Sequence, residues 1–234
     1  MNITYCKGYE AMSEMAASVV TREIENRHDL LLCAATGHSP AGVYAQLAGQ
    51  GAKDPAFFGA LRVVKLDEWG GLPENHPATG EHYLRTRLVD PLRIAPERYL
   101  SFRSAPPDPV AECARIRAAL DAGGPIDLCI LGLGSNGHLG FNEPAAGLEP
   151  HCHVARLSET SRGHTMVEAL SDKPAFGLTL GMRDILLAGR IILLVWGANK
   201  AEPLRALLSG QITTQLPASL LWLHPRVDCI VGLP

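Results

Sequence analysis

The chain of 234 residues is rich in apolar side chains and nearly neutral, and these properties exclude several classes of protein. Hydrophobic residues make up 47% and charged residues 19%, so the chain can form a sizeable core and is not expected to be disordered. The net charge is -3 and basic residues form no long block, which argues against nucleic acid or an anionic membrane as the partner. A small-molecule partner is favoured.

The sequence shows no membrane segment and no secretory leader. The longest unbroken apolar run spans residues 191–196, far short of the roughly 20 residues of a membrane-spanning helix. The first residues lack a basic segment followed by an apolar stretch, so we expect a cytoplasmic protein. The six cysteines include no Cys-x-x-Cys pair, and we expect reduced, structural thiols.

Short apolar runs rich in branched residues alternate with amphipathic stretches along the chain. In chain order, the expected strands are residues 3–6, 30–35, 62–66, 127–131, 154–157, 190–196 and 227–231. Between them, apolar residues keep helical spacing over 12–24 and 110–120. This alternation predicts an α/β protein with helices around a mostly parallel sheet. At roughly 150 residues per domain, a single domain over residues 1–234 is the favoured organisation.

The first segment with chemical potential reads Ala-Thr-Gly-His-Ser-Pro at residues 35–40 and follows an expected strand. Ser39 is a plausible N-cap and Pro40 a first helical residue. The helix start would then present free amides to a phosphate, although an ordinary capped turn has the same pattern. A nucleotide P-loop is disfavoured because Val43 and Tyr44 stand where Lys and Ser or Thr are needed.

The second segment carries adjacent carboxylates, Asp67 and Glu68, at the end of an expected strand. Parallel strands of open α/β sheets bind ligands at their carboxyl ends. Neighbouring side chains of an extended chain point in opposite directions, so one carboxylate is expected to face a ligand and the other to support it. A solvated acidic turn is the alternative. Trp69 and the Gly-Gly-Leu-Pro sequence after it favour a loop that closes over a site.

The third segment is glycine-rich and spans residues 131–144. Its spacing satisfies Gly-x-Gly-x-x-Gly, but further glycines and Pro144 prevent the helix that a dinucleotide site requires. What remains is a loop in which glycines such as Gly134 let a ligand approach the backbone. On this loop His138 and Glu143 are suited to act as a general acid/base and its orienting partner.

Two further segments contain candidate ligand-binding side chains. Lys200 follows the most apolar expected strand and could hold a phosphate as a point charge, although a solvated lysine is the alternative. The tract His151-Cys152-His153 resembles a metal site, but no third or fourth ligand is apparent nearby. We therefore expect neither a metal nor a cofactor.

Taken together and in this order, the segments resemble the amino-sugar-6-phosphate deaminase/isomerase family, whose relatives include glucosamine-6-phosphate deaminase and 6-phosphogluconolactonase. The resemblance covers residues 31–231 and also includes Gly-Ala-Asn-Lys at 197–200 and Pro-Ala-Ser-Leu-Leu-Trp-Leu-His at 217–224. The forms Lys-Leu-Asp-Glu-Trp and Leu-Gly-Ser-Asn-Gly-His are most similar to the galactosamine-6-phosphate branch.

The resemblance implies a doubly wound, Rossmann-like sheet with helices on both faces that uses no nucleotide and no metal. It implies that Asp67 moves the proton between C1 and C2 of the opened sugar, that His138 opens the ring and that Glu143 is its partner. Glu68 and Asn136 complete the expected catalytic set. The expected substrate-binding residues are those of the turn after the second strand, of the glycine-rich loop and of the later basic positions: Thr36, Gly37, His38, Ser39, Gly134, Lys200, Arg162 and His164.

Two departures from the family pattern concern the site. Glucosamine-6-phosphate deaminases usually carry Asp before the Gly-His pair, whereas this chain has Asn136, which cannot ionise. The Ser pair and basic residues that bind an activator in allosteric members are missing after Asn142-Glu143-Pro144, so we expect no activation by an N-acetylated sugar phosphate. The second phosphate contact is open between Arg162 and His164.

The implied activity is conversion of galactosamine 6-phosphate or glucosamine 6-phosphate to the ketose 6-phosphate and ammonia. Two alternatives remain at this point: a 6-phosphogluconolactonase, which needs no enolisation base, and a non-catalytic sugar-phosphate sensor. The expected partner is a small sugar phosphate, with no nucleic acid and no membrane, and the sequence is compatible with a homo-oligomer.

Overall fold

A seven-stranded parallel sheet forms the centre of the protein. The computed structural model describes residues 1–233. In spatial order the strands are β1 (Asn2–Lys7), β10 (Val227–Leu233), β9 (Arg190–Val195), β6 (Leu128–Gly132), β2 (Leu31–Ala34), β3 (Arg62–Lys65) and β5 (Tyr99–Leu100). Every neighbouring pair is parallel. The expected α/β fold is confirmed, and the short strand β5 was not predicted.

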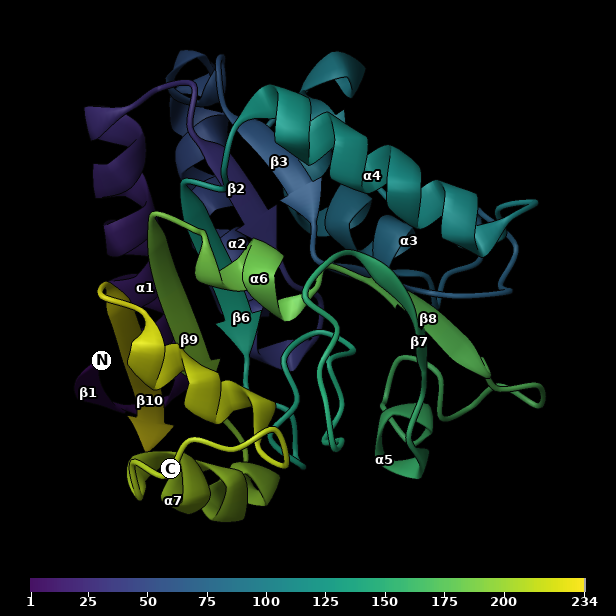
Figure 1. Cartoon of the computed structure of the whole chain (residues 1–234). Helices are drawn as coiled ribbons and strands as arrows, with labels where there is room; N and C mark the ends of the chain where they lie inside the picture. Colours follow the sequence, from purple (N-terminus) through teal and green to yellow (C-terminus); the bar gives the residue numbers. More distant parts are fainter. Residues whose placement is uncertain (234) are drawn as a thin grey trace.

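Helices cover both faces of this sheet because side chains alternate between the faces along each strand. Leu32 and Ile130 pack in one core with α1 (Gly8–Asn26) and α2 (His38–Lys53). Cys33 and Leu131 pack in a second core with α4 (Pro109–Gly123), α6 (Met182–Leu186) and α7 (Ala201–Leu208). Figure 1 shows α4, α6 and α7 on one side of the strands and α1 and α2 on the other. The doubly wound arrangement is therefore confirmed.

A second, antiparallel sheet of three strands lies beside the main one. It consists of β4 (Asp67–Trp69), β8 (Phe176–Thr179) and β7 (His153–Arg156). The prediction of one strand over 62–66 was wrong at its end, because the chain bends at Leu66 and Asp67 begins a strand of the second sheet. β4 and β8 escaped prediction because three or four residues carry too little periodicity.

Short helical elements connect the larger ones. They are α3 (Gly80–Leu84), α5 (Glu159–Arg162), the π-helical turn η2 (Arg85–Val89) and the 3-10 turns η1 (Pro55–Phe58), η3 (Pro96–Arg98), η4 (Ala198–Lys200) and η5 (Pro217–Leu223). All six cysteines are free, and all but Cys152 are buried, as expected for reduced structural thiols. Over residues 1–233, no helix combines the length and hydropathy needed to cross a membrane.

The strand order creates a crevice between β2 and β6. The chain continues from β2 to β3 on one side, and from β6 by a long connection to β9 on the other. Where the connections after two neighbouring parallel strands run in opposite directions, a crevice opens at the carboxyl ends of those strands, and α/β proteins bind ligands in such crevices. Residues 35–40 follow β2 and residues 133–144 follow β6, so two of the segments singled out in the sequence meet at this point.

Candidate active site

A cavity of about 370 Å³ occupies this crevice. Its walls come from segments after β2, β6 and β9, from β4 and from the region around α5. It brings together Asp67, His138, His164, Lys200, Gly134 and the turn Thr36, Gly37, His38 and Ser39. Glu68, Asn136, Glu143 and Arg162 do not line it. The predicted residues thus divide into those that can touch a ligand and those that cannot.

The turn between β2 and α2 has a backbone shaped for an anion. Gly37 is the N-cap with a φ of 105°, in the left-handed region that favours glycine. The helix begins at His38, so the prediction of Ser39 as N-cap was wrong by two residues, and no side chain caps this helix. The uncapped amides of the first helical turn therefore remain free to bind a negatively charged group in the cavity.

Three tyrosines hold this turn from behind. The hydroxyl of Tyr44 donates to the carbonyl of Ala35 at 2.7 Å, that of Tyr9 to His38 at 2.6 Å and that of Tyr83 to Gly37 at 2.5 Å. These three hydrogen bonds fix the carbonyl oxygens of Ala35, Gly37 and His38.

Asp67 stands at the start of β4 and faces the cavity, although only 9% of the residue is exposed. Burial, reinforced by the negative charge of Glu68 and opposed by Lys65, raises the pKa of Asp67 to about 7. A carboxyl group with such a pKa can accept and return a proton near neutral pH.

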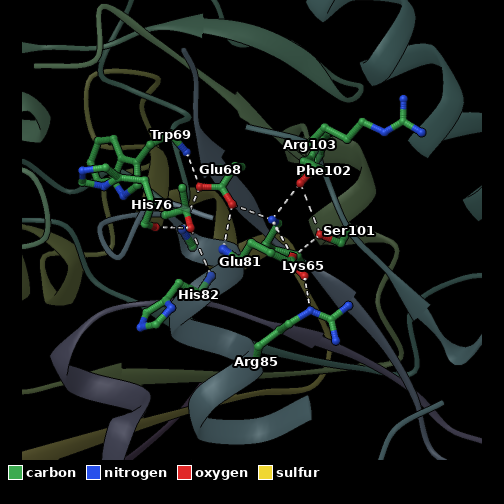
Figure 2. A network of polar contacts seen from close by, with 12 residues as sticks. Lys65, Glu68, Trp69, His76, Glu81, His82, Arg85, Ser101, Phe102 and Arg103 are labelled. Carbon is green, nitrogen blue, oxygen red and sulfur yellow. Dashed lines mark hydrogen bonds and ion pairs between the residues drawn. The ribbon is translucent and has the colours of Figure 1, made fainter. Parts of the chain in front are cut away.

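Glu68 points away from the cavity, as the alternation of side chains on a strand requires. Its carboxylate accepts hydrogen bonds from the backbone N–H groups of Trp69, Gly80 and Glu81 at 2.7 to 2.8 Å. It also forms an ion pair with the buried Lys65 at 2.5 Å (Figure 2). Glu68 can therefore support Asp67 but cannot itself contact a ligand in this cavity.

His138 and Glu143 are adjacent, with 3.4 Å between Nδ1 of the imidazole and Oε2 of the carboxylate. Ser158 and Ser161 donate their hydroxyls to Oε1 of Glu143 at 2.9 and 2.5 Å. Although burial opposes ionisation of Glu143, the contacts with His138, Ser161 and Asn136 prevail and lower its pKa to about 2. A carboxylate that stays ionised can orient the imidazole and stabilise its protonated form.

Asn136 connects the same two residues without touching the imidazole ring. Its Nδ2 donates to Oε2 of Glu143 at 2.9 Å, and its Oδ1 accepts from the backbone N–H of His138 at 3.2 Å. A neutral amide can donate to Glu143, which an aspartate in this place could not do when ionised. Asn136 thereby favours the charged form of Glu143.

The His138 ring packs directly against the backbone of Gly134. A Cβ atom at position 134 would lie 2.4 Å from Cδ2 of His138, much closer than carbon atoms approach without strain. The backbone of Gly134 also lines the cavity. Glycine is therefore required here for close approach of the ring, in addition to any contact with a ligand.

Lys200 and His164 are basic side chains on the wall of the cavity that the candidate phosphate turn also lines. Burial lowers the pKa of Lys200, and burial together with His138 and Lys200 lowers the pKa of His164 to about 4. His164 lies against Gly37, since its Nε2 would be 3.7 Å from a Cβ there. Arg162 is exposed and outside the cavity, so of the two candidates left open, His164 is the one positioned to contact a ligand.

Sequence reasoning missed part of the wall and part of the support. Trp69 and Phe141 form an aromatic pair on the wall, with ring centroids 4.6 Å apart. Trp69 had been assigned to a loop that closes over a site, whereas Phe141 was missed; its position inside the glycine-rich segment was the available signal. Ser158 is the N-cap of α5, and Ser161 lies within α5 and lines the cavity. A serine before a helix start was the available signal for Ser158, whereas the proximity of both serines to Glu143 is a tertiary feature.

The tract 151–153 lies away from the cavity. Nδ1 of His151 lies 3.6 Å from Oδ1 of Asp184. The backbone carbonyl oxygen of His151 lies 2.8 Å from Nδ1 of His153. Among residues 1–233, no three His, Cys, Asp or Glu side chains are grouped as metal ligands.

Comparison with known proteins places the chain among sugar-phosphate enzymes. A family model described as glucosamine-6-phosphate isomerases/6-phosphogluconolactonase matches residues 7–230. The chain is 36% identical to an Escherichia coli (strain K12) protein that bears the provisional name deaminase AgaI, over 97% of this chain and 90% of that protein. It is 34% identical to glucosamine-6-phosphate deaminase 1 of Bacillus subtilis (strain 168), over 99% of this chain and 96% of the relative.

Solved structures agree with this placement. A structure of a monomeric glucosamine-6-phosphate deaminase matches with a TM-score of 0.93 at 34% identity, covering 99% of this chain and 97% of that chain. The 6-phosphogluconolactonase of Trypanosoma cruzi matches with a TM-score of 0.81 at 20% identity, covering 99% and 94%, and shares the fold. Because the family match covers almost the whole chain and relatives above 30% identity align over nearly their full length, this chain belongs to the glucosamine-6-phosphate isomerase/6-phosphogluconolactonase family.

Proposed function

We propose that the protein is an amino-sugar-6-phosphate deaminase that converts galactosamine 6-phosphate, or its C4 epimer glucosamine 6-phosphate, to the ketose 6-phosphate and ammonia. One observation carries the proposal. A single cavity joins a carboxyl group titrating near neutrality, a histidine paired with an ionised glutamate, and an anion-binding turn beside a lysine. These are the three functions that an aldose-to-ketose conversion of a phosphorylated sugar requires.

Each group of residues has its own step in the proposed reaction. The N-terminal amides of α2, Lys200 and His164 bind the phosphate and fix the sugar in the cavity. His138, oriented by Glu143, moves the proton that opens the ring. Asp67 then takes the proton from C2 and delivers it to C1, which converts the 2-amine to an imine. Water adds to C2 and ammonia leaves, so the ketose 6-phosphate remains.

Galactosamine 6-phosphate is the proposed preferred epimer. The support is the sequence Lys-Leu-Asp-Glu-Trp at residues 65–69 and the form Leu-Gly-Ser-Asn-Gly-His at 133–138, which resemble the galactosamine branch. Relatives named glucosamine-6-phosphate deaminase support the reaction class. The same comparisons support a sugar-phosphate substrate, and the proposed reaction needs neither metal nor nucleotide.

The decisive experiment measures ammonia release from galactosamine 6-phosphate and glucosamine 6-phosphate in parallel, in metal-chelated buffer without nucleotide. Hydrolysis of 6-phosphogluconolactone is measured alongside. We expect ammonia and ketose 6-phosphate in equal amounts, with higher kcat/KM for the galactosamine compound. Faster turnover of the glucosamine compound would reverse the epimer. Lactone hydrolysis without ammonia would replace the proposed activity by that of a lactonase, and tight binding without any product would indicate a sensor.

A further inference from the structure

A buried lysine lies next to the candidate base. The Lys65 side chain is completely inaccessible, and its Nζ contacts three oxygens: Glu68 Oε2 at 2.5 Å, the Phe102 carbonyl at 2.8 Å and Glu81 Oε2 at 3.1 Å. Figure 2 shows Lys65 enclosed by these groups. Its three N–H bonds are all satisfied inside the protein, so Lys65 has no capacity left for a ligand.

The carboxylates around Lys65 are fixed from several elements. Glu68 receives three backbone N–H groups in addition to the lysine. Glu81 receives the hydroxyls of Tyr99 and Ser101 and an ion pair from Arg85 at 2.8 Å. We call Lys65, Glu68 and Glu81 the buried charge network. Arg85 contacts it from the surface, with a side chain that is 46% exposed and also pairs with Asp90.

This network connects the candidate base to the candidate phosphate turn. The backbone N–H of Gly80 donates a hydrogen bond to Glu68. Gly80 also packs closely against three neighbours, because a Cβ atom there would lie 3.3 Å from the Asp67 carbonyl oxygen, from Glu68 Oε1 and from Thr36 Cγ2. On the same short helix, Tyr83 donates to Gly37. The ion pair therefore holds α3 against both Asp67 and the 36–39 turn.

Stability alone is a weak reason for burying these charges. Replacing a buried ion pair by apolar side chains of similar size is often neutral or stabilising. The position of the pair offers a better reason, because Lys65 and Glu68 flank Asp67 along the chain with opposite charges.

We propose that Lys65 and Glu68 are positioning residues: their fixed ion pair holds α3 against the backbone of Asp67, and their opposite charges, two residues before and one residue after Asp67, act together on its buried carboxyl group. The role of Asp67 as the base rests on the proposed function, whereas the electrostatic coupling does not. Glu68 favours the protonated acid and Lys65 favours the ionised carboxylate, and their mutual contacts fix both charges in place beside Asp67.

Other charged or titratable groups line the same cavity as Asp67. They are His38 from α2, His138 from the glycine-rich loop, His164 after α5 and Lys200 from η4. The named shifts of the Asp67 pKa come from burial, Glu68 and Lys65. The variants below leave the cavity groups unchanged, so a change in Asp67 titration reports on the network.

The test compares Lys65→Met, Glu68→Gln and the double variant with the unmodified protein. The Asp67 carboxyl is titrated by ¹³C NMR on aspartate-labelled protein, with its signal assigned by Asp67→Asn. We expect an upward shift of at least about one pKa unit in Lys65→Met and a downward shift in Glu68→Gln, with the double variant in between. One unit is a tenfold change in ionisation equilibrium, and the acid limb of kcat/KM should move with it.

Glu112→Gln is the matched control. Glu112 is also buried and paired with an arginine, Arg115 at 2.6 Å, but it does not line the cavity. It should leave the Asp67 titration unchanged. If both single variants lower turnover while the titration stays in place, or if both move it in one direction, the network is merely structural and the inference is wrong.

The test remains informative if one variant fails to fold or if the protein has no deaminase activity. If Lys65→Met does not fold, Glu68→Gln still separates the two roles, because a purely structural role predicts no downward shift of the Asp67 pKa. The NMR titration needs no substrate. Shifts in the expected directions without ammonia release would refute the proposed function and retain the coupling, whereas ammonia release with an unmoved titration would refute the coupling alone.

Discussion

At the scale of single residues, Asp67 combines burial with a position on the cavity wall. Its pKa of about 7 in the folded protein, against an ordinary value of 3.8, means that the folded state holds a proton which the unfolded chain releases between about pH 4 and pH 7. The folded state therefore loses stability as the pH rises through this window. The group suited to proton transfer is thus a cost to the fold at neutral pH.

Asp67→Asn should remove this cost and the activity together. We expect loss of turnover with KM or substrate affinity little changed. The stability gain over the unmodified protein should be larger at pH 8 than at pH 5 by about 2 to 3 kcal/mol. Urea unfolding of both proteins at the two pH values measures this. Equal gains at both values, or retained turnover, would contradict the role given to Asp67.

Asn136 is the second residue whose chemistry can be isolated. Asn136→Asp replaces a donor to Glu143 by a like charge, so the pKa of Glu143 should rise by about one unit or more. Asn136→Ala removes the donor without adding charge and should raise it less. Carboxyl NMR on glutamate-labelled protein, assigned by Glu143→Gln, measures both. An unchanged or lower Glu143 pKa in Asn136→Asp would show that the hydrogen bond at 2.9 Å has no electrostatic effect.

At the scale of elements, the bend at Leu66 decides which carboxylate lines the cavity. Had β3 continued straight, Asp67 would have extended the main sheet; instead it pairs with Thr179 in the second sheet. This pairing leaves Asp67 on the cavity side and Glu68 among the amides that begin α3. Because strand side chains alternate, a shift of register by one residue would exchange the two.

The tyrosine contacts on the phosphate turn give an element-scale prediction. Tyr83→Phe removes one hydrogen bond, with a net value of about 1 kcal/mol, from α3 to Gly37. We expect KM to rise about fivefold, with kcat less affected, because a phosphate held by this turn, as proposed, would be bound in ground and transition states alike. Tyr5→Phe, at a side chain that is 54% exposed, is the control. Unchanged KM in Tyr83→Phe would mean that the turn keeps its shape without this tie.

At the scale of the whole molecule, the cavity is assembled from segments far apart in sequence, so ligand binding should stabilise the entire fold. A ligand present at 100 times its Kd stabilises by about 2.7 kcal/mol, and for a chain of this length each kcal/mol raises Tm by about 2 to 4 °C. Inorganic phosphate should therefore raise Tm by several degrees relative to chloride at equal ionic strength. Lys200→Ala should lose most of this shift; if it keeps the full shift, Lys200 is not a phosphate ligand.

Local patterns in the sequence determined much of the fold. Long apolar runs predicted seven strands of the two sheets with ends correct to within about two residues, because burial of both faces imposes a strong composition. The short strands β4, β5 and β8 carried no such pattern. Their existence depends on pairing partners that the chain brings from more than ten to over a hundred residues away.

For the site, the sequence by itself determined which residue types were available: Asp67, His138, Glu143 and Lys200 follow strands or glycine-rich turns whose local chemistry points to ligand binding. Only the tertiary structure decided that Asp67, His138 and Lys200 line one cavity, that Glu68, Asn136 and Glu143 do not line it, and that His164 rather than Arg162 does. The physical reason is that side-chain direction, burial and pKa depend on neighbours contributed by other elements. Sequence spacing cannot encode those neighbours, whereas the divergence of the chain at β2 and β6 brings them together.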